Sequence, residues 1–289
     1  NTSELTKDED GTVINKTASY AGDGGLQQVF AGVGFKVLDN LSIGANISYI
    51  YGDITHSVTT AFSNSSSFSS VRLDKISIND YKLDFGLQYS YKFNKKHVLN
   101  FGAVYSLGHS MNGKGYKYNQ KWLNGADYPS TQTGDTITNA FSLPHTFGAG
   151  LTYVYDNRLT VGADFTYQKW EDAKFYNEKN YFCNRTKIAV GAEFIPSPYS
   201  HNYLKRIRYR VGGYYSDPYT KVDGQDGTRE YGVSAGFGFP LFQSKSILNI
   251  SGQYVKVSPK VKGMLEENYL KINIGLTFNE RWFMKWKVD

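Results

Sequence analysis

The chain has 289 residues, of which 40% are hydrophobic, 20% are charged and 16% are aromatic, with a formal net charge of +6. No stretch of about 18 apolar residues occurs, which excludes a transmembrane helix. The single cysteine, Cys183, excludes an intrachain disulfide. Lys and Arg are scattered among acidic residues, so the positive charge favours attraction to anionic lipid over a nucleic-acid partner.

About eleven segments alternate strictly between apolar and polar residues, a pattern typical of strands with two different faces. In chain order we predict strands near 26–37, 41–54, 76–93, 98–110, 138–155, 158–171, 185–195, 204–216, 229–241, 246–257 and 269–283. Many reach about 10 residues, the length that a tilted strand needs to cross a bilayer. The sequence therefore predicts an all-β fold, a transmembrane antiparallel up-and-down β-barrel.

The links between these strands alternate in length. Tight turns are expected at 38–40, 94–97 and 156–157, and long polar loops at 55–75, 111–137 and 172–184. In outer-membrane barrels the short turns face the periplasm and the long loops face outside, which predicts the orientation of this chain. Pairs of tyrosines near strand ends, such as Tyr49 with Tyr51 and Tyr89 with Tyr91, are expected to form the two interfacial girdles.

An odd number of strands conflicts with the even number that bacterial single-chain barrels normally have. Together with the missing export signal, this predicts that at least one strand precedes Asn1. Three preceding strands and an N-terminal plug are the favoured version of this prediction. Residues 1–25 are then an extracellular loop or the end of a longer N-terminal region, and residues 26–289 are the barrel. A strand over 13–20 is the less favoured alternative, because both of its faces are polar.

Three stretches, 22–52, 142–170 and 269–288, share more than simple alternation with a known family. The middle stretch carries Leu143, Pro144, Gly150, Tyr153, Asp164 and Trp170. On these residues the chain resembles the FadL-like transport family of the bacterial outer membrane, in its Bacteroidetes branch. The resemblance implies about 14 strands in the full protein, of which about 11 are visible here, and a barrel plugged by an N-terminal hatch.

The resemblance also implies a function, the uptake or passage of hydrophobic compounds such as long-chain fatty acids. Relatives of the PorV type are instead subunits of larger machines. The alternative function is therefore that of a non-transporting barrel subunit in an outer-membrane protein secretion or assembly complex. Expected partners are outer-membrane lipid, a hydrophobic small molecule or fatty acid, and other outer-membrane proteins or lipoproteins.

Ionisable residues on the predicted inner face form the candidate site for a ligand in the lumen. Alternation places Arg206, Arg208 and Arg210 on one side of a strand, and neighbouring strands offer Lys187, Glu193 and Asp164. Charges at membrane depth are costly unless they are paired or wet. The favoured interpretation is a salt-bridge network that fills a narrow barrel. The alternative is an anion site, because guanidinium groups bind carboxylates in a bidentate manner.

Glycine is concentrated on the same predicted face, which would let strands bend or let a ligand or plug approach the backbone closely. The glycines are Gly32, Gly34, Gly44, Gly86, Gly102, Gly148, Gly150, Gly162, Gly191, Gly212, Gly236, Gly238 and Gly275. The five histidines lack metal-ligand spacing, and no sequence feature unites a nucleophile with a base and an orienting group. We therefore expect neither an enzyme nor a cofactor or metal site.

Overall fold

The computed structural model describes residues 2–7, 11, 13–63, 68–123, 131–176, 179, 181–222, 224–241, 246–259 and 266–278. Antiparallel strands dominate this part of the chain. Two short 3₁₀ turns, η1 (Trp170–Asp172) and η2 (Tyr203–Arg206), interrupt the connections. No helix among these residues is long and apolar enough to cross a membrane.

Eleven strands of the described part form one continuous curved sheet, each paired with its neighbours in chain order, and they match the eleven predicted segments. They are β2 (Val13–Leu38), β3 (Leu41–Phe62), β4 (Phe68–Lys92), β5 (His97–Ser106), β8 (Thr146–Tyr155), β9 (Leu159–Gln168), β10 (Arg185–Phe194), β11 (Arg208–Ser216), β14 (Thr228–Pro240), β15 (Ile247–Pro259) and β16 (Glu267–Thr277). The predicted all-β barrel architecture is thereby confirmed. The end of the last predicted strand, 279–283, lies outside the described residues.

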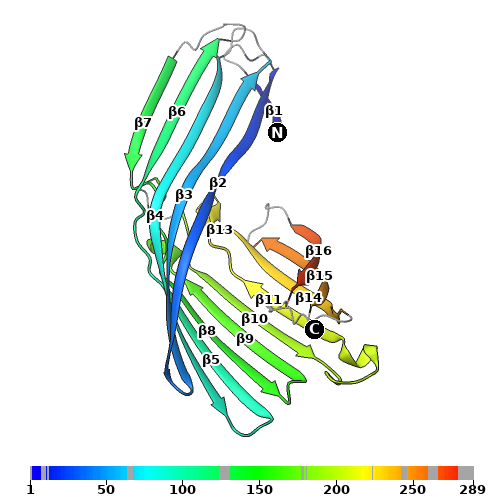
Figure 1. Cartoon of the computed structure of the whole chain (residues 1–289). Helices are drawn as coiled ribbons and strands as arrows, with labels where there is room; N and C mark the ends of the chain where they lie inside the picture. The colour runs from blue at the N-terminus through cyan, green and yellow to red at the C-terminus, as the bar shows by residue number, and fades with distance from the viewer. Residues whose placement is uncertain are drawn as a thin grey trace, which may run out of the picture.

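The sheet curves like a barrel wall but does not close within the described residues. Within the described residues its first long strand, β2, and its last strand, β16, do not pair with each other. Figure 1 shows the two strands facing each other across the open side of the molecule.

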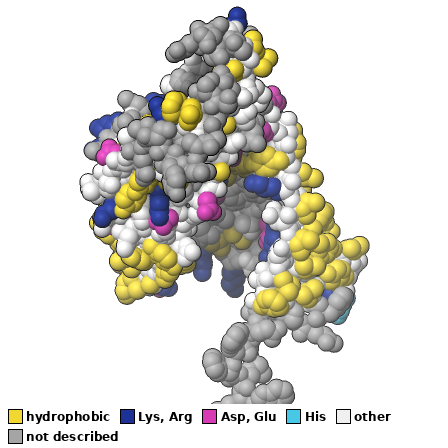
Figure 2. Space-filling view, turned by 90° about the horizontal axis from the view of Figure 1, so that it is seen from above, with side chains coloured by type: hydrophobic (Ala, Val, Ile, Leu, Met, Phe, Trp, Pro, Cys, Tyr) yellow, Lys and Arg dark blue, Asp and Glu magenta, His cyan; other side chains and the backbone are white. Residues whose placement is uncertain are grey.

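Strand register fixes which residues share a face, because directly opposed residues in antiparallel strands point the same way. In β14, Val233 and Phe237 are exposed, whereas the alternate residues Gly232 and Gly236 are buried against neighbouring strands. Following the pairs across the sheet places all thirteen predicted glycines on one face. This inner face also carries most of the polar residues, and Figure 2 shows hydrophobic side chains along the outer flank of the sheet.

Three of the strands continue far beyond the predicted membrane segment. β2, β3 and β4 have 26, 22 and 25 residues, and they combine with β1 (Thr2–Lys7), β6 (Gly113–Leu123) and β7 (Thr131–Thr138) into a second sheet region. We call the described residues of 2–25, 53–79 and 113–138 the wall. Figure 1 shows the wall standing above the short strands of the barrel.

The wall corrects three expectations. Residues 2–7 and 13–25 form strands and not a loop, and much of the predicted loops 55–75 and 111–137 is paired β-structure. The sequence signal failed because polar residues occupy both faces over most of the wall, so sustained apolar alternation is absent there. Strands form there without that signal because β-branched residues such as threonine favour them, and because each extended strand pairs with an extended neighbour.

Candidate functional site on the inner face

The central contact of the inner face joins β10 to β11. Glu193 lies directly opposite Arg210 in the register. Arg210 Nε donates to Glu193 Oε2 at 2.6 Å, and Arg208 Nη1 donates to Glu193 Oε1 at 3.2 Å. One carboxylate therefore serves two guanidinium groups. The side chains are partly shielded, with 24% exposure for Glu193 and 36% for Arg210.

The contact continues across the sheet toward the last strands. Arg210 Nη1 donates to Asn249 Oδ1 at 2.7 Å, and Asn249 Nδ2 donates to Thr277 Oγ1 at 3.2 Å. The intervening strand β14 contributes Gly236 and Gly238, and a Cβ at Gly238 would lie 3.2 Å from Arg208 Cβ. Glycine here allows long arginine side chains to lie across the neighbouring strand. The network thus links β10 to β16.

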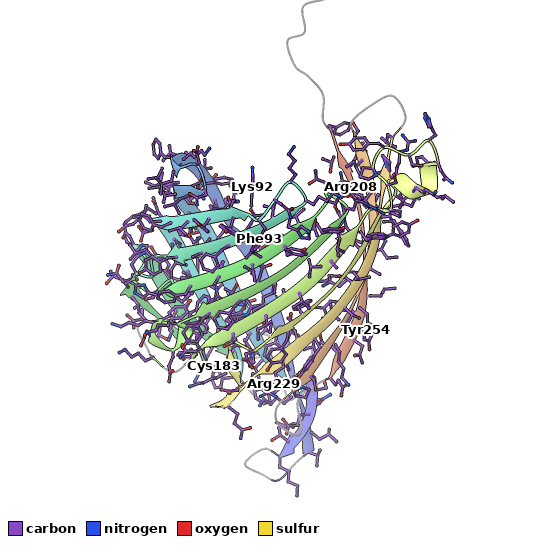
Figure 3. All side chains as sticks on the ribbon, turned by 90° about the horizontal axis from the view of Figure 1, so that it is seen from below. Lys92, Phe93, Cys183, Arg208, Arg229 and Tyr254 are labelled. Carbon is purple, nitrogen blue, oxygen red and sulfur yellow. The ribbon has the colours of Figure 1, made fainter. Side chains whose placement is uncertain are left out.

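Arg206 departs from the predicted row of three arginines. Strand β11 begins at Arg208, and Arg206 ends the 3₁₀ turn η2, where its guanidinium lies 5.5 Å from the centre of the Tyr203 ring. The turn forms because the Asn202 side chain accepts a hydrogen bond from the Leu204 backbone N–H, an N-cap arrangement. Figure 3 shows Arg208 at the end of the strands where this turn lies.

Lys187 and Asp164 share the inner face but lie apart from the arginine pair. Lys187 Nζ is 5.2 Å from the centre of the Tyr214 ring, a distance typical of a cation–π contact. The Tyr214 ring in turn lies over Gly232, where a Cβ would overlap it. Asp164 is exposed and sits against Gly150, with no ion pair to it among the described residues. The structure therefore brings together Arg208, Arg210 and Glu193 and separates the rest.

A layer of loop residues covers the inner face at the opposite end, and we call it the loop cap (described residues of 107–112, 139–145, 169–184 and 217–220). Three isolated β-bridges connect the segments, Ser110 with Ser142, Phe141 with Phe175, and Phe182 with Thr220. Below them, inner-face residues of β3 and β4 pack with cap residues in one buried cluster. Its members are Ile50, Ile76, Ile78, Met111, Ala140 and Tyr176.

The second half of the loop cap is aromatic. The Trp170 ring centre lies 5.2 Å from that of Phe182 and 5.3 Å from that of Tyr219. Trp170 Nε1 donates to Gln168 on the inner face of β9 at 3.1 Å. Burial raises the pKa of Tyr176 in the same cap to about 12, and the nearby Asp74 carboxylate raises it further. The cap corrects three predicted strands: the strand predicted at 98–110 ends at Ser106, the one at 138–155 begins at Thr146, and the one at 158–171 ends at Gln168.

The paired charges of the inner face allow a direct test by removal of the shared carboxylate. Glu193→Gln should lower the free energy of unfolding by about 1–2 kcal/mol, less than for a fully buried pair because water reaches these groups. Asp164→Asn is the matched control on the same face and should have almost no effect. Urea titration of the folded, heat-modifiable form on gels measures both, and equal losses would contradict the pairing.

Solved structures with the same fold are outer-membrane transporters. A FadL homologue from Pseudomonas aeruginosa has a TM-score of 0.51 and 16% identity, with 89% of this chain and 65% of that chain covered. The toluene transporter TbuX from Ralstonia pickettii has a TM-score of 0.55 and 11% identity, covering 93% and 78%. The RagAB peptide importer has a TM-score of 0.51 and 9% identity, covering 90% and 34%. This chain thus spans less than two thirds of the FadL homologue and about a third of the RagAB chain.

These identities establish the fold alone: the chain has the β-barrel fold of outer-membrane transporters. No curated protein matches it. Residues 2–289 match the BamG family, and the chain belongs to that family. The FadL-like resemblance is therefore confirmed at the level of fold, while the family is BamG.

Proposed function

We propose that this chain is a barrel subunit of a larger protein assembly complex in the bacterial outer membrane, and that it holds a partner on its wall. Membership of the BamG family is consistent with this role. The observation that carries the proposal is the free edge of β7. Among the described residues, β7 pairs only with β6, so its other side presents unpaired backbone groups.

An exposed strand edge is a template for pairing with another chain, and proteins usually protect such edges with Lys, Pro or a bulge. β7 has the sequence TQTGDTIT, without Lys or Pro, and its register with β6 runs without a shift. A partner strand can therefore add to this edge and gain main-chain hydrogen bonds. The long-loop end of the barrel faces outside, so the expected partner is an outer-membrane protein or lipoprotein exposed at the cell surface.

The inner face supports docking over passage. Arg208 and Arg210 both bind the Glu193 carboxylate, and Arg210 also donates to Asn249, so the one carboxylate of the site is paired within the chain. The loop cap fills part of the opposite end with a packed apolar cluster. A route for a hydrophobic compound along this face would pass the charged side chains of Arg208, Arg210 and Glu193, which opposes its movement.

Affinity purification of the tagged, full-length protein from outer membranes in mild detergent tests the role. We expect another outer-membrane protein at near-equal stoichiometry, and depletion of the chain should lower the amount of folded outer-membrane barrels. Thr133→Lys with Thr136→Lys, which protects the β7 edge, should release the partner. The matched control, Thr55→Lys with Thr59→Lys on the central strand β3, should retain it. A chain that purifies alone, with normal barrel assembly after depletion, contradicts the proposal.

The aromatic part of the loop cap favours a second candidate function, the binding and passage of hydrophobic compounds. Trp170, Phe182 and Tyr219 offer rings in mutual contact at one end of the inner face, and aromatic side chains commonly form apolar binding sites. A fluorescent fatty acid should then bind the purified protein and lose affinity on Trp170→Ala. Absence of saturable binding in the wild type rules this candidate out.

A further inference from the structure

The outward face of the barrel contains an apolar groove across β2, β3, β4, β5 and β8. It has a volume of about 620 Å³, within the range of sites for small molecules. The rings of Phe85, Tyr105 and Phe147 form one side, with centroid separations of 6.5 Å and 5.1 Å between neighbours. Ala45 and Ala103, with the backbone of adjacent glycines, leave the hollow between larger side chains.

The groove lies at the depth of the bilayer centre. Leu87, which lines it, is six residues from Tyr81 and six from Phe93, the aromatic residues near the two ends of the membrane part of β4. The outward face at this depth is apolar throughout, as required for contact with lipid chains. Membrane lipid is therefore what lies against the groove.

A basic cluster lies at the turn end of the same strands. Lys95 and Lys96 are exposed in the β4–β5 turn, and no ion pair joins them to a carboxylate in the part of the chain that the structure describes. Lys92, the last residue of β4, lies on the inner face with Gly86. The nearby acids are Asp39, paired with Lys36 at 3.0 Å, and Asp156, whose backbone N–H donates to Lys96 O. Figure 3 shows Lys92 and Phe93 together at this end.

The distance along β4 from the groove to the turn is close to the length of one acyl chain in a bilayer leaflet. Five residues of extended strand between Leu87 and Lys92 span about 17 Å, close to half of the roughly 30 Å hydrocarbon core. A lipid whose headgroup lies at the lysines thus places its chain end in the groove. We propose that these elements form one site for an anionic phospholipid, with the headgroup on Lys95 and Lys96 of the turn and an acyl chain between Ala103 and the rings of Phe85, Tyr105 and Phe147.

Native mass spectrometry of the full-length protein in detergent, with added phosphatidylglycerol or phosphatidylcholine, tests the site. Phosphatidylglycerol should bind more tightly. Lys95→Gln with Lys96→Gln should weaken its binding roughly fivefold per lysine and leave phosphatidylcholine unchanged. Ala103→Trp fills the groove and should weaken both lipids. The matched control, Ala235→Trp on the outward face of β14, should weaken neither.

Equal binding of both lipids to wild type and all variants would show only a non-specific lipid layer and overturn the proposal. Loss of a co-purified protein on Ala103→Trp with unchanged lipid binding would assign the groove to a protein partner and also overturn it. If Ala103→Trp does not assemble, Ala45→Phe fills the adjacent part of the groove. These readouts do not depend on the β7 edge, so the site and the proposed docking role can fail separately.

Discussion

Val233→Arg is expected to destabilise the protein by about 2–4 kcal/mol in a bilayer, the cost of an arginine on the lipid face near the membrane centre. Val233 lies near the middle of β14 (Thr228–Pro240), points outward and is 62% exposed in the isolated chain. Its surroundings in the membrane are lipid chains, which cannot solvate a guanidinium group. Urea titration of protein folded into vesicles, followed by heat-modifiability on gels, measures the loss.

Ser234→Arg is the adjacent control and should cost well under half as much. Ser234 faces the inner side, where it lines a polar pocket of about 310 Å³ with Asn249, Ser251 and Gln253. A long polar side chain can extend into this space and remain hydrated. Equal costs for the two neighbours, or a greater cost for Ser234→Arg, would mean that the lipid face and the inner face have been exchanged.

The barrel strands could be predicted because lipid imposes a simple rule on them. Every second residue of a lipid-facing strand must be apolar. The alternation in segments such as 229–241 and 246–257 therefore predicts which residues face lipid and, within a few residues, where each strand ends. The paired strands are Thr228–Pro240 and Ile247–Pro259. The glycine bias followed from the same alternation, since fixing one face of a strand fixes the other.

The wall and the loop cap escaped prediction because neither depends on that rule. Much of the wall carries polar residues on both faces, and strands such as Thr131–Thr138 show no amphipathic period. The cap depends on contacts distant in sequence, for example Phe141 with Phe175. In the candidate site, alternation correctly placed Arg208 and Arg210 on one face. It extended the row wrongly to Arg206. This residue belongs to a 3₁₀ turn capped by Asn202, and such a short turn leaves no apolar alternation in the sequence.

Gly24→Ala is expected to destabilise the junction between wall and barrel by at least about 2 kcal/mol. Gly24 has a φ of +95°, a conformation that costs other residues about 1–3 kcal/mol. An added Cβ would also overlap the carbonyl oxygen of Asp53 on the paired strand β3. Gly52, across the same junction, has a φ of +142°, and its Cβ would overlap the carbonyl oxygen of Gly25. Both strands therefore need glycine where the wall begins.

Gly25→Ala is the control that distinguishes the need for glycine at Gly24 from a general sensitivity of the junction to substitution. Gly25 is adjacent to Gly24 but has no positive φ, and a Cβ added to it would have no atom within 4 Å, so its replacement should leave stability unchanged or slightly raised. The damage from Gly24→Ala should stay local, because β2 and β3 remain paired below the junction through Val33 with Ala45. Limited proteolysis should therefore cut the wall of Gly24→Ala faster while the barrel keeps its heat-modifiability. If Gly24→Ala and Gly25→Ala resist protease equally, the junction does not depend on the left-handed backbone at Gly24.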